Sequence, residues 1–127
     1  MDIAITLPQD LWKNIVSGEK SIELRKNFPK EFDVNTDRVY VMLKGTKLIA
    51  GYFKVICFER FNAENGNAFD SVLDEISVPK QWVVNYVGNK SYVYLWRIGD
   101  VFEFGKPINR DYYWKMQSNP QSFVYLR

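Results

Sequence analysis

The segment Ser17-Gly18-Glu19-Lys20-Ser21-Ile22-Glu23-Leu24-Arg25-Lys26 marks a change from helix to strand early in the chain. Residues 7–16 before it are amphipathic and predict a short helix, and Gly18 suits the left-handed residue that ends one. After the glycine, apolar and polar side chains alternate, as in a strand with one buried face. The apolar face would hold Ile22 and Leu24. The other face would present a polar row: Glu19, Ser21, Glu23 and Arg25.

A strand of mixed charge beside a helix end is a good place to bind a polar ligand. Arg25 can hold a phosphate or carboxylate through two parallel hydrogen bonds. Lys20 could act as a base or nucleophile if burial beside a carboxylate lowered its pKa, and Glu23 could orient it or accept a proton from a bound amine. The segment therefore makes Lys20 and Glu23 candidate catalytic residues, and Ser21, Arg25 and Lys26 candidate ligand contacts.

The same segment, followed by Phe28-Pro29, resembles the signature of ASCH domains, members of the PUA-like superfamily. Residues 38–43 with Ile49-Ala50-Gly51-Tyr52-Phe53 look like the central strand pair of that family. Asn119-Pro120-Gln121-Ser122-Phe123-Val124-Tyr125-Leu126 is similar to the closing segment of many small members. The resemblance covers essentially the whole chain. It implies a single domain over residues 1–127, built as a small, mostly antiparallel PUA-like β-barrel with flanking helices.

The resemblance also implies a choice of activities. Some ASCH proteins resemble amidohydrolases of N4-acylated cytidine nucleosides, with a lysine in the Gly-x-Lys segment, a hydroxyl residue three positions on and a distant glutamate. Lys20 matches that lysine, but Glu23 stands in place of the hydroxyl residue and Ser21 has a different offset. Nuclease action, known among ASCH relatives, and a protein-interaction role are further alternatives. The acidic residue stays open among five candidates: Glu59, Glu64, Asp74, Glu75 and Glu103.

Gln121 and Ser122 are the second group of candidate ligand contacts. A glutamine side chain carries both a donor and an acceptor for a base edge, and a serine hydroxyl can play either part. If the last strand closes the barrel near the first motif, both residues would line the same cleft as Arg25. The leading hypothesis is a domain that binds RNA, a nucleoside or a nucleotide. Glu23 would accept a base amino group, and Arg25 would hold a phosphate or a carbonyl.

Composition restricts the chemistry more than it identifies the ligand. The chain has 127 residues, of which 46% are hydrophobic and 17% aromatic, as expected of one globular β-rich domain. Its net charge of +2 does not by itself indicate a nucleic-acid binder. The absence of histidine excludes a Ser-His-Asp triad and His-ligated zinc. We expect no metal and no cofactor.

Cysteine and hydropathy bear on the cellular compartment. Cys57 is the only cysteine, so no intrachain disulfide can form, and its apolar neighbours predict a buried thiol. No apolar run approaches the roughly 18 residues that a membrane span needs, and the first residues lack the basic segment of a signal peptide. We therefore expect a cytoplasmic protein without a membrane partner. The oligomeric state stays open.

The remaining pattern predicts a mostly β protein of the α+β class. Residues 91–98 are apolar on both faces, which indicates a central strand. Gly51 interrupts a strand and predicts a bulge or a close backbone contact. Residues 107–116 receive no assignment. Strands are predicted at residues 2–6, 20–26, 38–44, 48–60, 91–98, 101–104 and 123–126, and helices at 7–16, 69–76 and 79–87.

Overall fold

The computed structural model describes residues 1–114 and 118–126. Six strands form one sheet in the order β2-β5-β4-β3-β1-β6, in which only β1 and β3 pair in parallel. The strands are β1 (Ile3–Leu7), β2 (Ile22–Arg25), β3 (Val39–Leu43), β4 (Leu48–Asn62), β5 (Tyr92–Asn109) and β6 (Phe123–Tyr125). The helices are α1 (Gln9–Ser17), α2 (Leu73–Ile76) and α3 (Lys80–Val87), with 3₁₀ turns η1 (Gly66–Ser71) and η2 (Arg110–Tyr112).

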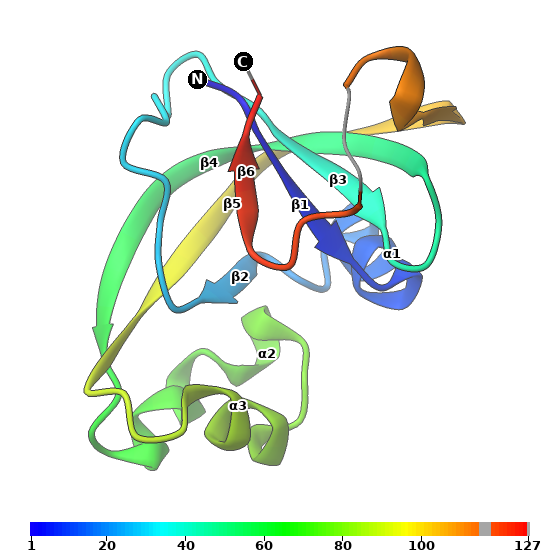
Figure 1. Ribbon diagram of the computed structural model, residues 1–127. Coiled ribbons are helices and arrows are strands. Elements are labelled where there is room, and N and C mark those ends of the chain that lie inside the picture. The colour runs from blue at the N-terminus through cyan, green and yellow to red at the C-terminus, as the bar shows by residue number, and fades with distance from the viewer. Residues whose placement is uncertain (115–117, 127) are drawn as a thin grey trace.

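The sheet curls into half a barrel, and the predicted mostly β architecture with flanking helices is confirmed. The long strands β4 and β5 sweep around one side, and β1 and β6 cross in front of them (Figure 1). Helix α1 covers one end of the sheet, whereas α2 and α3 lie together below β2. Both chain ends lie close together at the opposite end of the molecule from α2 and α3 (Figure 1).

The concave side of the sheet and α1 enclose the main core. In α1, Trp12 and Ile15 are buried, as their spacing predicts, and Gly18 ends the helix with a φ of 88°. They pack against the inward side chains of β1, β3, β4 and β5, including Ile5, Phe53 and Trp96. A second core joins the helical connection between β4 and β5 to the back of β2 and β5. Helix α3 and strand β2 are therefore held against the same body, which positions the site described below.

Two predicted elements differ from the observed ones. The helix predicted at 69–76 is wrong as a single element, because the chain forms the 3₁₀ turn η1 and then α2, with Val72 between them outside helical geometry (φ −124°, ψ 2°). The strand break predicted at Gly99 is also wrong. Strand β5 continues through it, because register shifts against β4 bend the strand without ending it. Residues 115 and 116 of the unassigned segment lie outside the described residues.

The prediction that Cys57 is buried is wrong, since its side chain is exposed. Strand β4 changes register against β5 between Val55 and Cys57. A bulge of this kind turns successive side chains away from strict alternation, and Ile56 in the middle of it is 64% exposed. The apolar run around Cys57 therefore reflects an irregular strand on the surface and not a core strand.

Gly51 lies where β4 passes close to β5 and α1, as predicted. A Cβ atom at this position would lie 2.2 Å from the carbonyl oxygen of Phe102 and 2.8 Å from Cζ2 of Trp12. The registers of β4 against both β3 and β5 shift next to it. Glycine is therefore required here by close approach of backbone and ring.

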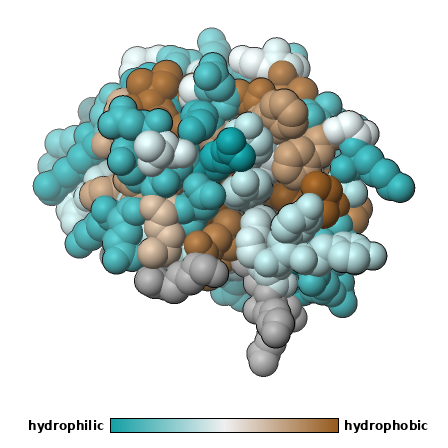
Figure 2. Space-filling view, turned by 90° about the horizontal axis from the view of Figure 1, so that it is seen from above, coloured by the Kyte–Doolittle hydropathy of each residue, from teal (hydrophilic) through white to brown (hydrophobic). Residues whose placement is uncertain are grey.

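The outer surface mixes polar and apolar groups. On the face that carries both chain ends, hydrophobic residues occur in separate groups among hydrophilic ones (Figure 2). Among the described residues, no helix has the length and apolar character to cross a bilayer.

Candidate functional site

A cavity of about 750 Å³ opens between the two edges of the curled sheet, and residues of α3 line it. We call it the main cavity. Its wall combines the polar strand β2, the ends of β1 and of the β3–β4 hairpin, helices α1 and α3, and the segment before β6. The volume is in the range of small-molecule sites. Its lining includes Thr6, Glu23, Arg25, Trp82, Tyr86 and Gln121.

Three charged side chains of the first motif form a chain of contacts at this wall. The Lys20 ammonium lies 3.5 Å from Oε1 of Glu23, and the Arg25 guanidinium lies 3.1 Å from Oε2 of the same carboxylate. Glu23 and Arg25 line the main cavity, whereas Lys20 is not among the described residues of its wall. The single carboxylate therefore stands between two cations, one facing the cavity and one behind it.

Lys20 is almost completely buried, with 2% of its surface exposed. Its ammonium donates to the backbone carbonyls of Ile22 at 2.8 Å and Ile76 at 2.7 Å. Ile76 is the last residue of α2, where carbonyl groups lack partners within the helix. Lys20 thus ties the end of α2 to β2 while neutralising Glu23. Burial lowers the pKa of Lys20, and the charge of Glu23 opposes that shift without cancelling it.

Glu23 is held in its ionised form despite having only 5% of its surface exposed. Burial alone would raise the pKa of its carboxyl group, but the charges of Arg25 and Lys20 outweigh burial and lower it. Each carboxylate oxygen has two lone pairs, so one contact to each oxygen leaves acceptor capacity for a ligand. The cavity wall therefore presents a fixed, negatively charged acceptor.

Arg25 connects strands that the sheet order places at opposite edges. It lies in β2, yet it donates to the carbonyl of Ser122, just before β6, at 3.3 Å and to the carbonyl of Thr6 in β1 at 3.4 Å. Its guanidinium also lies over the Trp96 ring, 5.8 Å from the ring centre. These contacts fix the plane of the guanidinium in the cavity wall.

The segment before β6 forms the opposite wall of the main cavity. The Thr6 hydroxyl donates to the Pro120 carbonyl at 2.7 Å, and the Asn119 amide donates to the Thr46 carbonyl of the β3–β4 hairpin at 2.7 Å. Gln121, which is exposed, lines the main cavity. The structure therefore brings Glu23, Arg25 and Gln121 to one concave surface from two distant parts of the chain.

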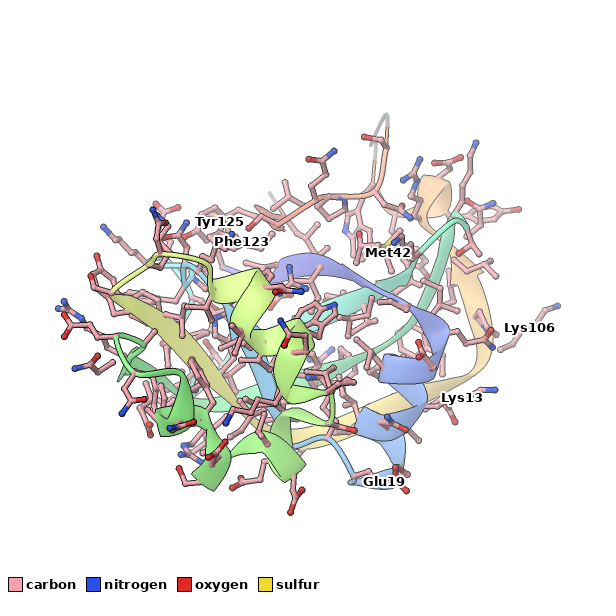
Figure 3. All side chains as sticks on the ribbon, turned by 90° about the horizontal axis from the view of Figure 1, so that it is seen from below. Lys13, Glu19, Met42, Lys106, Phe123 and Tyr125 are labelled. Carbon is pink, nitrogen blue, oxygen red and sulfur yellow. The ribbon has the colours of Figure 1, made fainter. Side chains whose placement is uncertain are left out.

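Other predicted contacts lie outside that surface. The Ser21 hydroxyl faces α2 and donates to Oε2 of Glu75 at 3.2 Å, and Lys26 packs its ammonium 4.8 Å from the Tyr86 ring centre. Ser122 contributes its backbone carbonyl to Arg25. Glu19 lies at the edge of the molecule near the end of α1 (Figure 3). Of the predicted polar row, Glu23 and Arg25 both line the main cavity, whereas Glu19 and Ser21 lie before β2, which begins only at Ile22.

The five acidic candidates separate by position. Glu75 is the one that contacts the first motif, through Ser21, and it also lies 3.6 Å from Arg97. Glu59 pairs with Arg97 at 3.1 Å on the surface of β4 and β5. None of the five belongs to the described lining of the main cavity. Within the described residues, no cluster of three His, Cys, Asp or Glu side chains could hold a metal ion.

Two aromatic residues of the cavity were missed in the sequence. Trp82 and Tyr86 lie four positions apart on α3 and stack with ring centres 5.1 Å apart and planes within 9° of parallel. Trp82 is 47% exposed, although it is one of the largest apolar side chains. The signal was present, because residues i and i+4 of the predicted helix share one face. The sequence pattern did not show that this face of the helix lies beside β2.

Comparisons with known proteins agree with this geometry at the level of the fold. No family model and no curated protein matches the chain. The crystal structure of ASCH from Zymomonas mobilis superposes with a TM-score of 0.83, at 21% identity over 99% of this chain and 87% of that one. A mutant of the same protein gives a TM-score of 0.82 at 22% identity, over 99% and 90%. A hypothetical protein gives 0.53 at 17% identity, over 78% and 97%.

The chain therefore has a PUA-like fold. More narrowly, its fold is that of an ASCH domain, which confirms the resemblance seen in the sequence.

Proposed function

We propose that the main cavity binds a nucleoside, a nucleotide or a nucleotide of single-stranded RNA. One observation carries the proposal: an ionised carboxylate and a guanidinium share a concave wall with a partly exposed aromatic stack. Trp82 offers a flat surface on which a base can stack, and such contacts are tolerant of base identity. The polar groups of the wall would then select the ligand.

Each polar group suits a different part of a nucleotide. Glu23 accepts from a base amino group, because its carboxylate is ionised and buried. Arg25 holds a carbonyl or a phosphate with N–H groups that its three backbone and side-chain contacts leave available. Gln121, on the opposite wall, can read a base edge as donor and acceptor.

A titration that follows tryptophan fluorescence and thermal stability tests the proposal. The panel contains cytidine, adenosine, guanosine, uridine, their monophosphates and short single-stranded RNA and DNA. A ligand at 100 times its dissociation constant should stabilise the fold by about 2.7 kcal/mol. Trp82→Leu should weaken binding by about 1–3 kcal/mol and Trp82→Phe by much less, since a phenyl ring still stacks. If no member of the panel changes fluorescence or stability, the proposal is wrong.

Two variants test the polar contacts. Gln121→Ala removes an exposed side chain and should weaken binding several-fold while leaving the melting temperature unchanged. Glu23→Gln replaces a charged acceptor with a neutral amide, so it should weaken amino-bearing bases more than uridine. Equal losses for all four bases would remove Glu23 from base recognition.

The amidohydrolase alternative has one observation in its favour, the lowered pKa of Lys20, since a buried lysine can serve as a base. Against it, the Lys20 ammonium donates to two carbonyls and stands behind Glu23. A hydrolysis assay with N4-acetylcytidine is the direct test. If the reaction occurs and Lys20→Arg retains its rate, Lys20 has a structural role only.

A further inference from the structure

A second cavity of about 420 Å³ lies on the convex side of the sheet, away from Glu23 and Arg25. We call it the aromatic cavity. Aromatic rings line much of it, and its apolar floor packs on the buried side chains of Ala4, Met42 and Ile49. Met42 lies between the sheet and the C-terminal part of the chain (Figure 3). The lining aromatic residues are Tyr40, Phe104, Tyr113 and Trp114.

The rings meet at angles that form walls. Tyr40 and Trp114 are 5.3 Å apart between ring centres with planes at 70°, and Tyr113 and Trp114 are 6.5 Å apart at 54°. The wall formed by Tyr113 and Trp114 is anchored through η2. The backbone amides of both residues donate to the Arg110 carbonyl, at 3.0 and 2.8 Å. Arg110 is itself buried and donates to Asn119. These hydrogen bonds therefore fix the shape of the aromatic cavity without a ligand.

Asp2 supplies the charged side chain, a carboxylate, among the described residues that line the aromatic cavity. Its Oδ1 accepts from the backbone amide of Arg38 at 2.8 Å, which fixes the carboxylate at the rim. The ammonium of Met1, one residue away, pairs with Asp37 instead. A carboxylate and the electron-rich faces of several rings both attract a cation, and neither favours an anion.

The same face already holds one cation. The Arg38 guanidinium lies over the Tyr52 ring, 4.5 Å from its centre, and Tyr52 packs against Tyr40. This contact lies beside the aromatic cavity and outside its lining. An aromatic ring of this face thus already contacts an exposed cation.

We propose that the aromatic cavity binds an alkylated ammonium group, held by cation–π contacts to Tyr40 and Trp114 and by the charge of Asp2. The group can belong to a free quaternary amine or to a methylated lysine of a protein segment. Its binding is independent of the main cavity, since the two linings share no described residue.

Calorimetric titration of the full chain with choline and with 3,3-dimethylbutan-1-ol tests the proposal, because the alcohol has the same shape without the charge. Choline should bind about ten-fold more tightly than the alcohol. A short peptide with trimethyllysine, compared with the same peptide carrying unmodified lysine, separates a protein segment from a free amine as the source. Equal affinity for choline and the alcohol overturns the proposal. So does a result in which neither small molecule and neither peptide binds.

Two variants separate the charge from the rings. Asp2→Asn keeps an oxygen that accepts from the Arg38 amide and removes the charge, so choline should lose several-fold in affinity while the alcohol does not. Trp114→Leu should abolish the preference for choline, whereas Trp82→Leu, in the main cavity, should leave it unchanged. A preference that survives both Asp2→Asn and Trp114→Leu overturns the assignment. Because Trp82→Leu tests nucleotide binding, the two proposals can fail separately.

Discussion

At the level of single residues, Lys20 shows how a charged group can be buried without a large loss of stability. A buried ammonium is costly unless it is paired and hydrogen-bonded. Here two carbonyls and one carboxylate surround it. The arrangement gives each of its three N–H groups an acceptor, so the lysine connects β2, α2 and Glu23 at one point.

Replacing Lys20 with methionine should therefore destabilise the fold by about 3 kcal/mol, because it leaves Glu23 and two carbonyls with fewer partners in a buried site. The control is Lys13→Met on the exposed side of α1 (Figure 3), which should change the free energy of unfolding by less than about 0.5 kcal/mol. Urea unfolding measures both. Similar small effects of the two changes would show that Lys20 is not a structural tie.

Glu23 should make stability depend on acid pH. Its folded pKa lies below the ordinary value of 4.5, because the charges of Arg25 and Lys20 outweigh the effect of burial. The unfolded chain therefore takes up the proton first, so the stabilisation is complete above about pH 4.5 and is lost as the pH falls through the folded pKa. Unfolding free energies measured from neutral pH down to about pH 3 should fall less steeply for Glu23→Gln than for the wild type. Parallel curves would contradict the assignment.

Lys20 should also make stability rise with pH, but in the alkaline range. Burial lowers its folded pKa below 10.5, so the unfolded state binds more protons between that folded pKa and 10.5. Stability should consequently rise with pH across this window, apart from the effects of other groups. The difference between wild type and Lys20→Met isolates the contribution.

At the level of elements, close approach between strands decides where β4 can run. Gly51 lies against the backbone of β5 and the ring of Trp12 from α1, with no room for a Cβ atom. The bulges beside it bend β4, and this bend lets one strand pair with both β3 and β5 over its length.

Gly51→Ala should destabilise the protein by about 3 kcal/mol, because backbone atoms must move to admit the methyl group. Gly105→Ala in β5 is the matched control, since a Cβ atom there meets nothing within 4 Å, and its effect should be small. Thermal unfolding of the two variants checks the difference. A Gly51→Ala protein as stable as Gly105→Ala would mean that the strands separate at little cost.

At the level of the whole molecule, a side chain links the two edges of the sheet, and among the described residues β2 and β6 do not pair through their backbones. Strands β2 and β6 end the sheet on opposite sides, and Arg25 bonds from β2 to the segment before β6 and to β1. Trp96 of β5 and Phe123 of β6 also meet across this gap, with ring centres 6.1 Å apart. The main cavity lies at the junction that Arg25 makes.

Arg25→Met should therefore loosen β6. Amide hydrogen exchange of Phe123–Tyr125 should accelerate by about ten-fold, because a local opening that exposes a short edge strand becomes less costly. Arg97→Met is the control, since Arg97 pairs with Glu59 and Glu75 on the surface, away from β6. Equal exchange of β6 in the two variants would show that β1 alone holds it.

Local patterns determined much of this protein from the sequence alone. Alternation, glycine positions and helical spacing identified α1, α3 and the β3–β4 hairpin, and the resemblance of three segments identified the ASCH fold. The predictions for Gly18 and Gly51 are confirmed. Gly18 ends α1 in a left-handed conformation, and Gly51 leaves no room for a Cβ atom. The i, i+4 spacing of Trp82 and Tyr86 is evident in the sequence. That spacing alone does not distinguish an exposed aromatic pair from one packed in the core.

Only the tertiary structure decided how the parts meet. Lys20 became a buried tie, Glu23 a buried acceptor and Cys57 an exposed thiol, because burial depends on which distant element covers a strand. The same is true of the contact from Arg25 to Ser122, which joins residues 97 positions apart. A sequence records the chemistry and the local period of each residue, whereas a site is made by neighbours that only folding brings within hydrogen-bonding distance.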